Sequence, residues 1–60
     1  MDVEIRFRTG RYAPVHENVR KMVSRSKEQA VHDLIAEFLH NNPEYKIEII
    51  STEVIYSNFP

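Results

Sequence analysis

Apolar and charged residues alternate at the start of the chain. Val3, Ile5 and Phe7 are separated by charged residues, and a spacing of two is typical of a strand with one buried face. We therefore predict a strand over residues 3–8. Gly10, the only glycine of the chain, follows closely and is expected to end this strand.

The clearest predicted element is an amphipathic helix over residues 27–41. Apolar residues recur there at spacings of three and four and form one stripe: Ala30, Val31, Leu34, Ile35, Phe38 and Leu39. Ser26 and Gln29 predict a capping box, in which the serine oxygen accepts from backbone N–H groups and the Gln29 side chain reaches back. Pro43 ends the helix, because proline disfavours helical geometry at the residue before it.

A second alternation predicts a strand from Tyr45 to Tyr56. Its phase slips at Ile49-Ile50, so that the later positions face the other way: Ile50, Thr52, Val54 and Tyr56. A continuous strand of this length would span ~40 Å. That is too long for a monomer whose radius of gyration should be roughly 10 Å. We therefore expect either a bulge or turn at Ser51-Thr52, or pairing of the distal half with another molecule.

Residues 13–25 fit two structures. As a helix, the segment would have Pro14 in its first turn and an apolar stripe that includes Val19 and Met22. As a strand, it would place Val19 and Val23 on one face. The short stretch from Val23 to Ser26 has no glycine to cap a helix, which favours the strand. We predict one α+β domain over residues 1–60, with the order β-β-α-β and one helix on an antiparallel sheet; β-α-α-β is the alternative.

The small size of the chain predicts self-association. A chain of 60 residues buries only about 60% of the surface that it exposes when unfolded. Domains of this size gain stability from disulfides, metals or oligomerisation, and the chain has no cysteine and only three histidines. We therefore predict a homodimer, with Ile50, Val54 and Tyr56 as the interface with a second copy or a partner.

The residue types present do not predict an enzyme. No serine has a histidine beside it in the sequence, and a nucleophile needs an adjacent base. Glu37 and His40 have the Glu-x-x-His spacing of di-iron bundles, but such sites need carboxylates from other helices. We expect no catalytic, cofactor or metal site. Without cysteine, a signal peptide or a long apolar run, the chain is expected in the cytoplasm, away from membranes.

The net charge of −1 conceals an asymmetry. Residues 1–30 sum to +3 and residues 31–60 to −4. Such polarity marks an anion-binding face or lets two copies complement each other. The first half also interleaves basic and aromatic residues over positions 6–12, a pattern that can bind nucleic acid. The candidate nucleic-acid contacts are Arg6, Arg8, Arg11 and Lys27.

With the helical reading of residues 14–24, the order strand, helix, helix is similar to that of ribbon-helix-helix DNA-binding proteins. The resemblance covers about two thirds of the chain and implies a dimer whose paired N-terminal strands enter the major groove. It implies base contacts by Glu4, Arg6 and Arg8, with Ser26 and Lys27 near a phosphate. The turn between the helices lacks the usual Gly or Asn, and a strand follows where that family usually ends or changes domain.

Two functions follow as hypotheses. The first is a small non-enzymatic homodimeric interaction module that binds another macromolecule, a protein before any other class. Small accessory or mobile-element proteins often have this profile, which is an analogy. The alternative is a ribbon-helix-helix-like dimeric DNA-binding regulator that uses the basic N-terminal strand.

Overall fold

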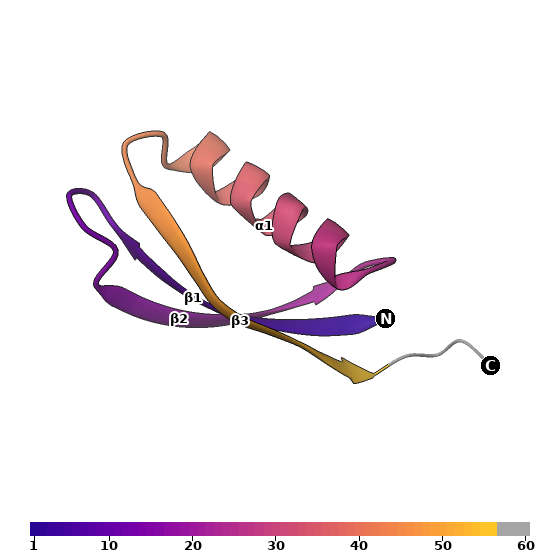
Figure 1. The fold of residues 1–60 in the computed structure, drawn as a ribbon. Coiled ribbons are helices and arrows are strands. Elements are labelled where there is room, and N and C mark those ends of the chain that lie inside the picture. The colour runs from indigo at the N-terminus through magenta and orange to yellow at the C-terminus, as the bar shows by residue number, and fades with distance from the viewer. Residues whose placement is uncertain (57–60) are drawn as a thin grey trace.

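A computed structural model of the chain describes residues 1–56, and of Tyr56 the backbone alone. Three strands and one helix follow one another along it (Figure 1): β1 (Asp2–Gly10), β2 (His16–Val23), α1 (Lys27–Asn41) and β3 (Lys46–Tyr56). This order confirms the predicted α+β fold and its β-β-α-β arrangement.

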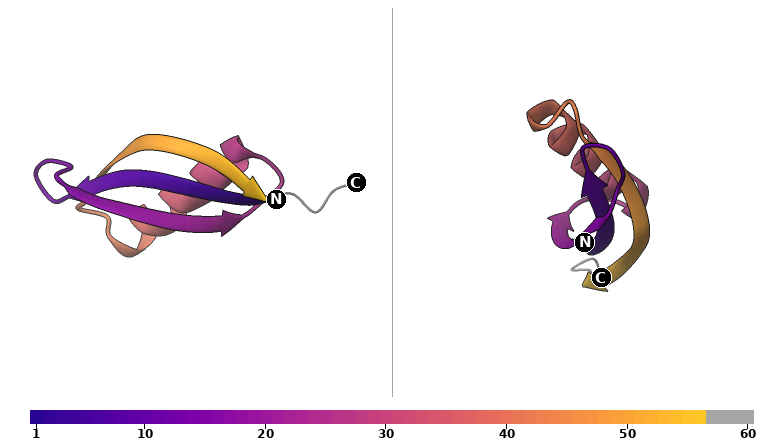
Figure 2. Two further views of the ribbon diagram at one scale, coloured as in Figure 1. Left: turned by 90° about the horizontal axis from the view of Figure 1, so that it is seen from below. Right: turned by 90° about the vertical axis from the view of Figure 1, so that its left-hand side faces the viewer.

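The three strands form one antiparallel sheet with β1 at its centre. The order across the sheet is β2-β1-β3, and the left view of Figure 2 shows β1 between its two neighbours. The helix α1 connects β2 to β3 and covers one face of the sheet (Figures 1 and 2). The molecule therefore has two layers, and the other face of the sheet has no layer over it among the described residues.

The core lies between β1 and α1. Its buried apolar side chains are Val3, Ile5, Phe7, Ala30 and Leu34. The three β1 residues alternate with polar ones, as predicted, so they point to the helix side together. Of the predicted helical stripe only Ala30 and Leu34 are fully buried, and its other members are half-buried.

Aromatic rings extend this core toward the end of the helix. The ring of Phe38 lies edge-on to that of Phe7, with 6.4 Å between centroids, and to that of Tyr45, with 5.7 Å. Edge-to-face pairs at these distances are favourable beyond the area that they bury. They join α1 to β1 and to the start of β3.

Both ends of α1 are capped. The Ser26 Oγ accepts a hydrogen bond from the backbone N–H of Gln29 at 3.0 Å, as predicted. The reciprocal half of the capping box is wrong, because the Gln29 side chain donates to Asp33 at 2.8 Å and does not reach back. At the other end, the backbone and side-chain N–H groups of Asn42 both donate to the Phe38 carbonyl.

Residues 16–23 form a strand, so the helical alternative for this segment is wrong. Each residue of β2 lies opposite one of β1, from Asp2 with Val23 to Thr9 with His16. Pairing with a neighbouring strand satisfies the backbone here without a helix. The strand–helix–helix order on which the ribbon-helix-helix resemblance depended is therefore absent.

Gly10 ends β1 for a steric reason. The loop over residues 11–15 folds back so closely that a Cβ on Gly10 would overlap the carbonyl oxygen of Ala13. The predicted strand end is thus set by close backbone approach, which only glycine permits.

The strand β3 is continuous and pairs with β1 from Lys46 to Tyr56, with two irregularities. Ile49 lies opposite Phe7 and Ser51 lies opposite Arg6, which leaves Ile50 as an extra residue. A second shift lies between Val54 and Tyr56. An extra residue of this kind is a β-bulge.

The first bulge corrects the predicted facing of the distal half of β3. Beyond it Thr52 lies opposite Ile5 and Val54 lies opposite Val3. Directly opposed residues point to the same face of a sheet, so Thr52 and Val54 return to the helix side. The prediction that they face the other way is wrong, and the bulge lies at Ile50 rather than at Ser51-Thr52.

The length of β3 does not require a second molecule. The radius of gyration is 11.9 Å and the longest dimension is 43 Å, because the strands run along the long axis of a flat molecule. The distal half of β3 pairs with β1 of the same chain. The argument from strand length was therefore wrong, while dimerisation itself stays a prediction.

We expect Leu34→Ala to leave the domain largely unfolded at 25 °C. Leu34 is fully buried, and removing a buried leucine costs about 2–5 kcal/mol. A core of this size supplies no more than about 3–5 kcal/mol in total. Urea titration followed by circular dichroism measures the effect. His32→Ala, at an exposed position of the same helix, is the control and should stay within about 0.5 kcal/mol; equal stability of the two variants would contradict this account of the core.

Candidate interaction surface

The open face of the sheet is built from the residues that alternate with the core. Because opposed residues share a face, the outward positions of β1 continue onto both neighbours. Arg8 lies between Glu17 and Glu48, and Arg6 lies between Val19 and Ser51. This face is therefore polar along β1, and Val19 and Val23 add apolar positions on its β2 side.

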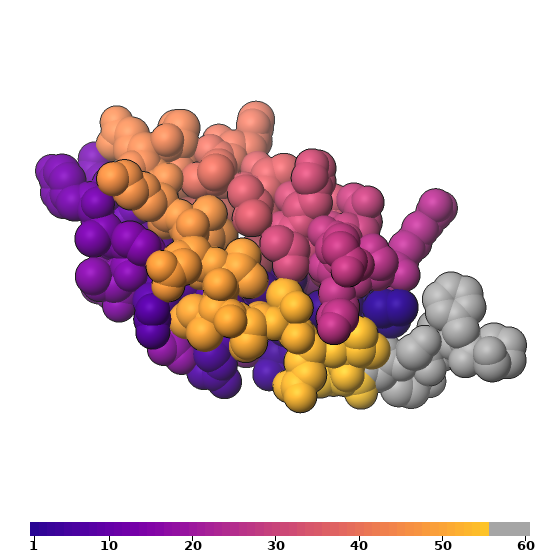
Figure 3. All heavy atoms as spheres, in the orientation of Figure 1, coloured from indigo at the N-terminus to yellow at the C-terminus, as the bar shows by residue number. Residues whose placement is uncertain are grey.

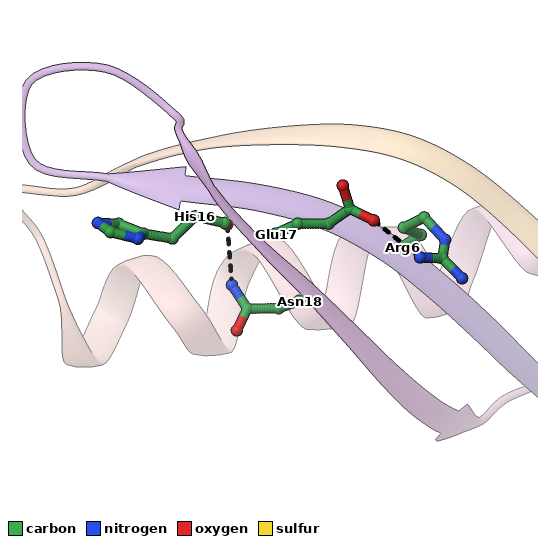
Figure 4. Close-up of polar contacts among 4 residues, drawn as sticks. All are labelled: Arg6, His16, Glu17 and Asn18. Carbon is green, nitrogen blue, oxygen red and sulfur yellow. Dashed lines mark hydrogen bonds and ion pairs between the residues drawn. The ribbon is translucent and has the colours of Figure 1, made fainter.

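Two ion pairs link β1 to its neighbouring strands across this face. The Arg6 Nη1 lies 2.7 Å from the Glu17 Oε1 on β2 (Figure 4), and the Arg8 Nη1 lies 3.0 Å from the Glu48 Oε1 on β3. The hydrogen bond from Arg6 to Glu17, and then the attraction between their charges, raise the pKa of Arg6 above its ordinary value. Arg6 therefore stays charged at neutral pH.

Two further ion pairs join distant parts of the chain. Arg11 contacts Glu44 at 2.5 Å, and Arg20 on β2 contacts Glu37 on α1 at 2.7 Å. With Arg8 and Glu48, three of the four arginine–glutamate pairs join the basic first half of the chain to its acidic second half. Exposed pairs of this type add little stability. They do show that much of the charge asymmetry is neutralised within one chain.

The structure does not gather the predicted nucleic-acid contacts into one surface. Arg6 and Arg8 lie on the open face and are paired with glutamates. Arg11 lies in the loop after β1 with its own glutamate. Lys27 starts α1, which lies on the opposite side of the sheet. Phosphate binding depends on clustered cationic groups, and this arrangement separates them.

The predicted interface on β3 is only partly brought together. Ile50 and Val54 are exposed, and Ile50 sits at the bulge while Val54 lies on the helix side. The side chain of Tyr56 is outside the described part of the chain. In the space-filling view β3, coloured orange to yellow, lies below α1 along the lower side of the molecule (Figure 3). Ile55, at the second bulge, adds another exposed apolar side chain to this edge.

Sequence reasoning missed the apolar surface of β2. Val19 and Val23 are exposed on the open face, and Val15, just before the strand, is also exposed. Their spacing of four is visible in the sequence, and the strand prediction places Val19 and Val23 on one face, but the pattern does not show that this face is open to solvent. Figure 4 shows polar neighbours of these valines on β2: the side-chain N–H of Asn18 donates to the His16 carbonyl, and Glu17 reaches Arg6.

Ionisable side chains near hollows remain open to solvent. A hollow of about 400 Å³ lies beside the loop after β1, lined in part by Tyr12, His16 and Tyr45, and His16 is exposed there. Glu37 and His40 are both exposed, and Glu37 pairs with Arg20. Within residues 1–56, no three His, Asp or Glu side chains come close enough to hold a metal ion. In the same range no helix has the length and apolarity needed to cross a bilayer.

Comparison of the chain with protein-family models, with curated proteins and with solved structures finds no match.

We expect duplex DNA to bind no more tightly than the non-specific range, about 10⁻⁶ M or weaker near physiological salt. The reason is that Arg6 and Arg8 already have glutamate partners. Fluorescence anisotropy at two salt concentrations measures the affinity. Glu17→Gln with Glu48→Gln frees both arginines and should tighten binding at low salt. Nanomolar binding that Arg6→Ala with Arg8→Ala abolishes would instead support the DNA-binding regulator.

Proposed function

We propose that this chain is a small homodimeric interaction module that binds another protein and carries no catalytic activity. The observation behind the proposal is an imbalance between buried and exposed apolar residues. Among the side chains of residues 1–55, five apolar ones form the core, whereas seven large ones are exposed: Tyr12, Val15, Val19, Val23, Ile50, Val54 and Ile55. Six of these seven lie on or beside the two edge strands.

Edge strands are suitable for binding proteins. Each carries a row of backbone N–H and C=O groups without a neighbour in the sheet, and an added strand can pair with them. Apolar side chains beside such an edge add affinity and select the incoming sequence. Protein strands match this surface better than phosphate backbones do, because the arginines of the open face are engaged by glutamates.

The two edges suit different partners. The β3 edge carries Ile50, Val54 and Ile55 around two bulges, and bulges interrupt regular strand addition. An irregular apolar surface of this kind fits side chains of a partner protein better than a long added strand. We assign Ile50 and Val54, with Tyr56 at the end of β3, to the partner, and place the module in the cytoplasm because it has no cysteine for disulfides.

The alternative function, DNA-binding regulation, has less support. It required a second helix in place of β2 and a cluster of free basic groups on β1. Residues 16–23 are a strand, and Arg6 and Arg8 are paired.

Sedimentation equilibrium should give a mass of about 14 kDa at high micromolar concentration, twice the 7.1 kDa of one chain. Because association stabilises only the folded form, the thermal midpoint should rise with protein concentration. A mass of one chain and a constant midpoint over a hundredfold range of concentration would refute the homodimer.

A further inference from the structure

The β2 edge is regular and open. Its register with β1 continues from His16 to Val23 without a shift, in contrast to the two shifts between β1 and β3. No other strand of the described chain pairs with the far side of β2. A regular, unpaired strand is the type of edge to which a further antiparallel strand adds most readily.

The hydrogen bonding of one residue pair shows which backbone groups of β2 face this edge. Met1 and Ser24 exchange two hydrogen bonds of 2.9 Å, N–H to O in each direction. Hydrogen-bonded and non-hydrogen-bonded pairs alternate along an antiparallel ladder, so every second residue of β2 from Ser24 backward bonds to β1. The remaining residues direct their backbone N–H and C=O groups to the open edge: Glu17, Val19, Lys21 and Val23.

The same four residues have side chains on the open face, and their sequence is complementary to itself. Val19 is the centre, with Glu17 two positions before it and Lys21 two positions after it. Val15 and Val23 lie four positions away on either side. The exposed fractions of Val15, Val19 and Val23 are 67%, 49% and 83%. A strand with this pattern presents matching chemistry to an antiparallel copy of itself.

We propose that β2 pairs antiparallel with β2 of a second copy, with Val19 on the two-fold axis. The inference rests on the homodimer proposed above and specifies its interface. Glu17 of each copy then lies opposite Lys21 of the other, and the two Val19 residues face each other. Val23 of each copy then lies at an end of the interface, beside the segment just before β2 of the other copy, which carries Val15. Cross-strand pairs of opposite charge and of β-branched residues each stabilise a sheet.

Backbone bonding adds to this match. In this register the pairs of Val19 with itself and of Glu17 with Lys21 are hydrogen-bonded pairs, because their backbone groups face the edge. Each such pair exchanges two bonds, which gives about six ladder bonds between the copies. The product is a six-stranded sheet with both helices on the same face, since a two-fold axis at this edge runs perpendicular to the sheet.

Neighbouring registers are less favourable. An axis at Glu17 opposes two glutamates, one at Lys21 opposes two lysines, and one at Arg20 opposes two arginines on the helix side. Like charges directly opposite one another destabilise a sheet. An axis at Asn18 sets Glu17 against Val19 and loses the charge pairing. Val19 is therefore the centre that joins opposite charges and apolar residues at once.

A charge-swap pair tests this register. Glu17→Lys opposes two lysines at both ends of the interface, and Lys21→Glu opposes two glutamates. We expect each variant alone to associate at least tenfold more weakly than the wild type in sedimentation velocity. Mixed one to one, they restore opposite charges at every contact, and the heterodimer should form within about threefold of the wild-type affinity. A variant that had lost its fold could not be rescued by mixing.

Cysteine substitution tests the axis directly. Val19→Cys brings two introduced cysteines to about 5.5 Å between Cα atoms, within the range of a disulfide. Oxidation should convert most of this variant to a covalent dimer on a non-reducing gel. Val23→Cys is the matched control, because the two Val23 positions lie roughly 26 Å apart in this register, and it should remain largely unlinked although Val23 is more exposed.

The outcomes separate the interface from the homodimer itself. Two results would overturn the β2 interface and leave the homodimer intact. In the first, both charge variants form dimers as readily as the wild type does. In the second, Ile50→Lys with Val54→Lys dissociates the dimer. Preferential linking through Val23→Cys would overturn the register. A wild type of one chain at every concentration would refute both proposals.

Discussion

The structure depends on β1, the central strand of the sheet, which pairs with both other strands and packs against α1. It pairs with β2 on one side and β3 on the other, and three of the five buried apolar side chains belong to it: Val3, Ile5 and Phe7. A central strand with one neighbour on each side leaves both neighbours as edges. A single helix covers only one face of the sheet. Three strands and one helix are therefore too few to cover the apolar residues of both edge strands.

Local patterns in the sequence were sufficient for the elements that carry the core. The alternation around Ile5 and the spacing of the helical stripe both depend on burial, and burial produces a periodic pattern of apolar residues in the sequence. The pattern of β2 is weaker, because of its apolar residues only Met22 packs on the core, while Val19 and Val23 lie on the open face. Its identity follows from its pairing with β1 and from the short connection to Ser26, and only the second of these was visible in the sequence.

The bulge at Ile50 could not be read from local pattern. The slip at Ile49-Ile50 has two explanations, a change of face or an extra residue, and both give the same sequence. What decides between them is the position of Ile5 on another strand, opposite Thr52. The pairing of charges within one chain could not be read from local pattern either. Arg8 and Glu48 are 40 residues apart in sequence, and only the passage of α1 across the sheet brings their strands together.

The two edge strands differ in what limits the addition of unwanted strands. Along β3, bulges disturb the ladder and so discourage indiscriminate strand addition. Along β2 the ladder is regular, and protection must come from the side chains. Lys21 would repel a copy whose own Lys21 lies opposite, yet it would attract one whose Glu17 lies opposite. In the proposed interface this pattern of charges favours one arrangement of two copies, and the backbone hydrogen bonds between the two β2 strands add to the weak attraction of the exposed charges.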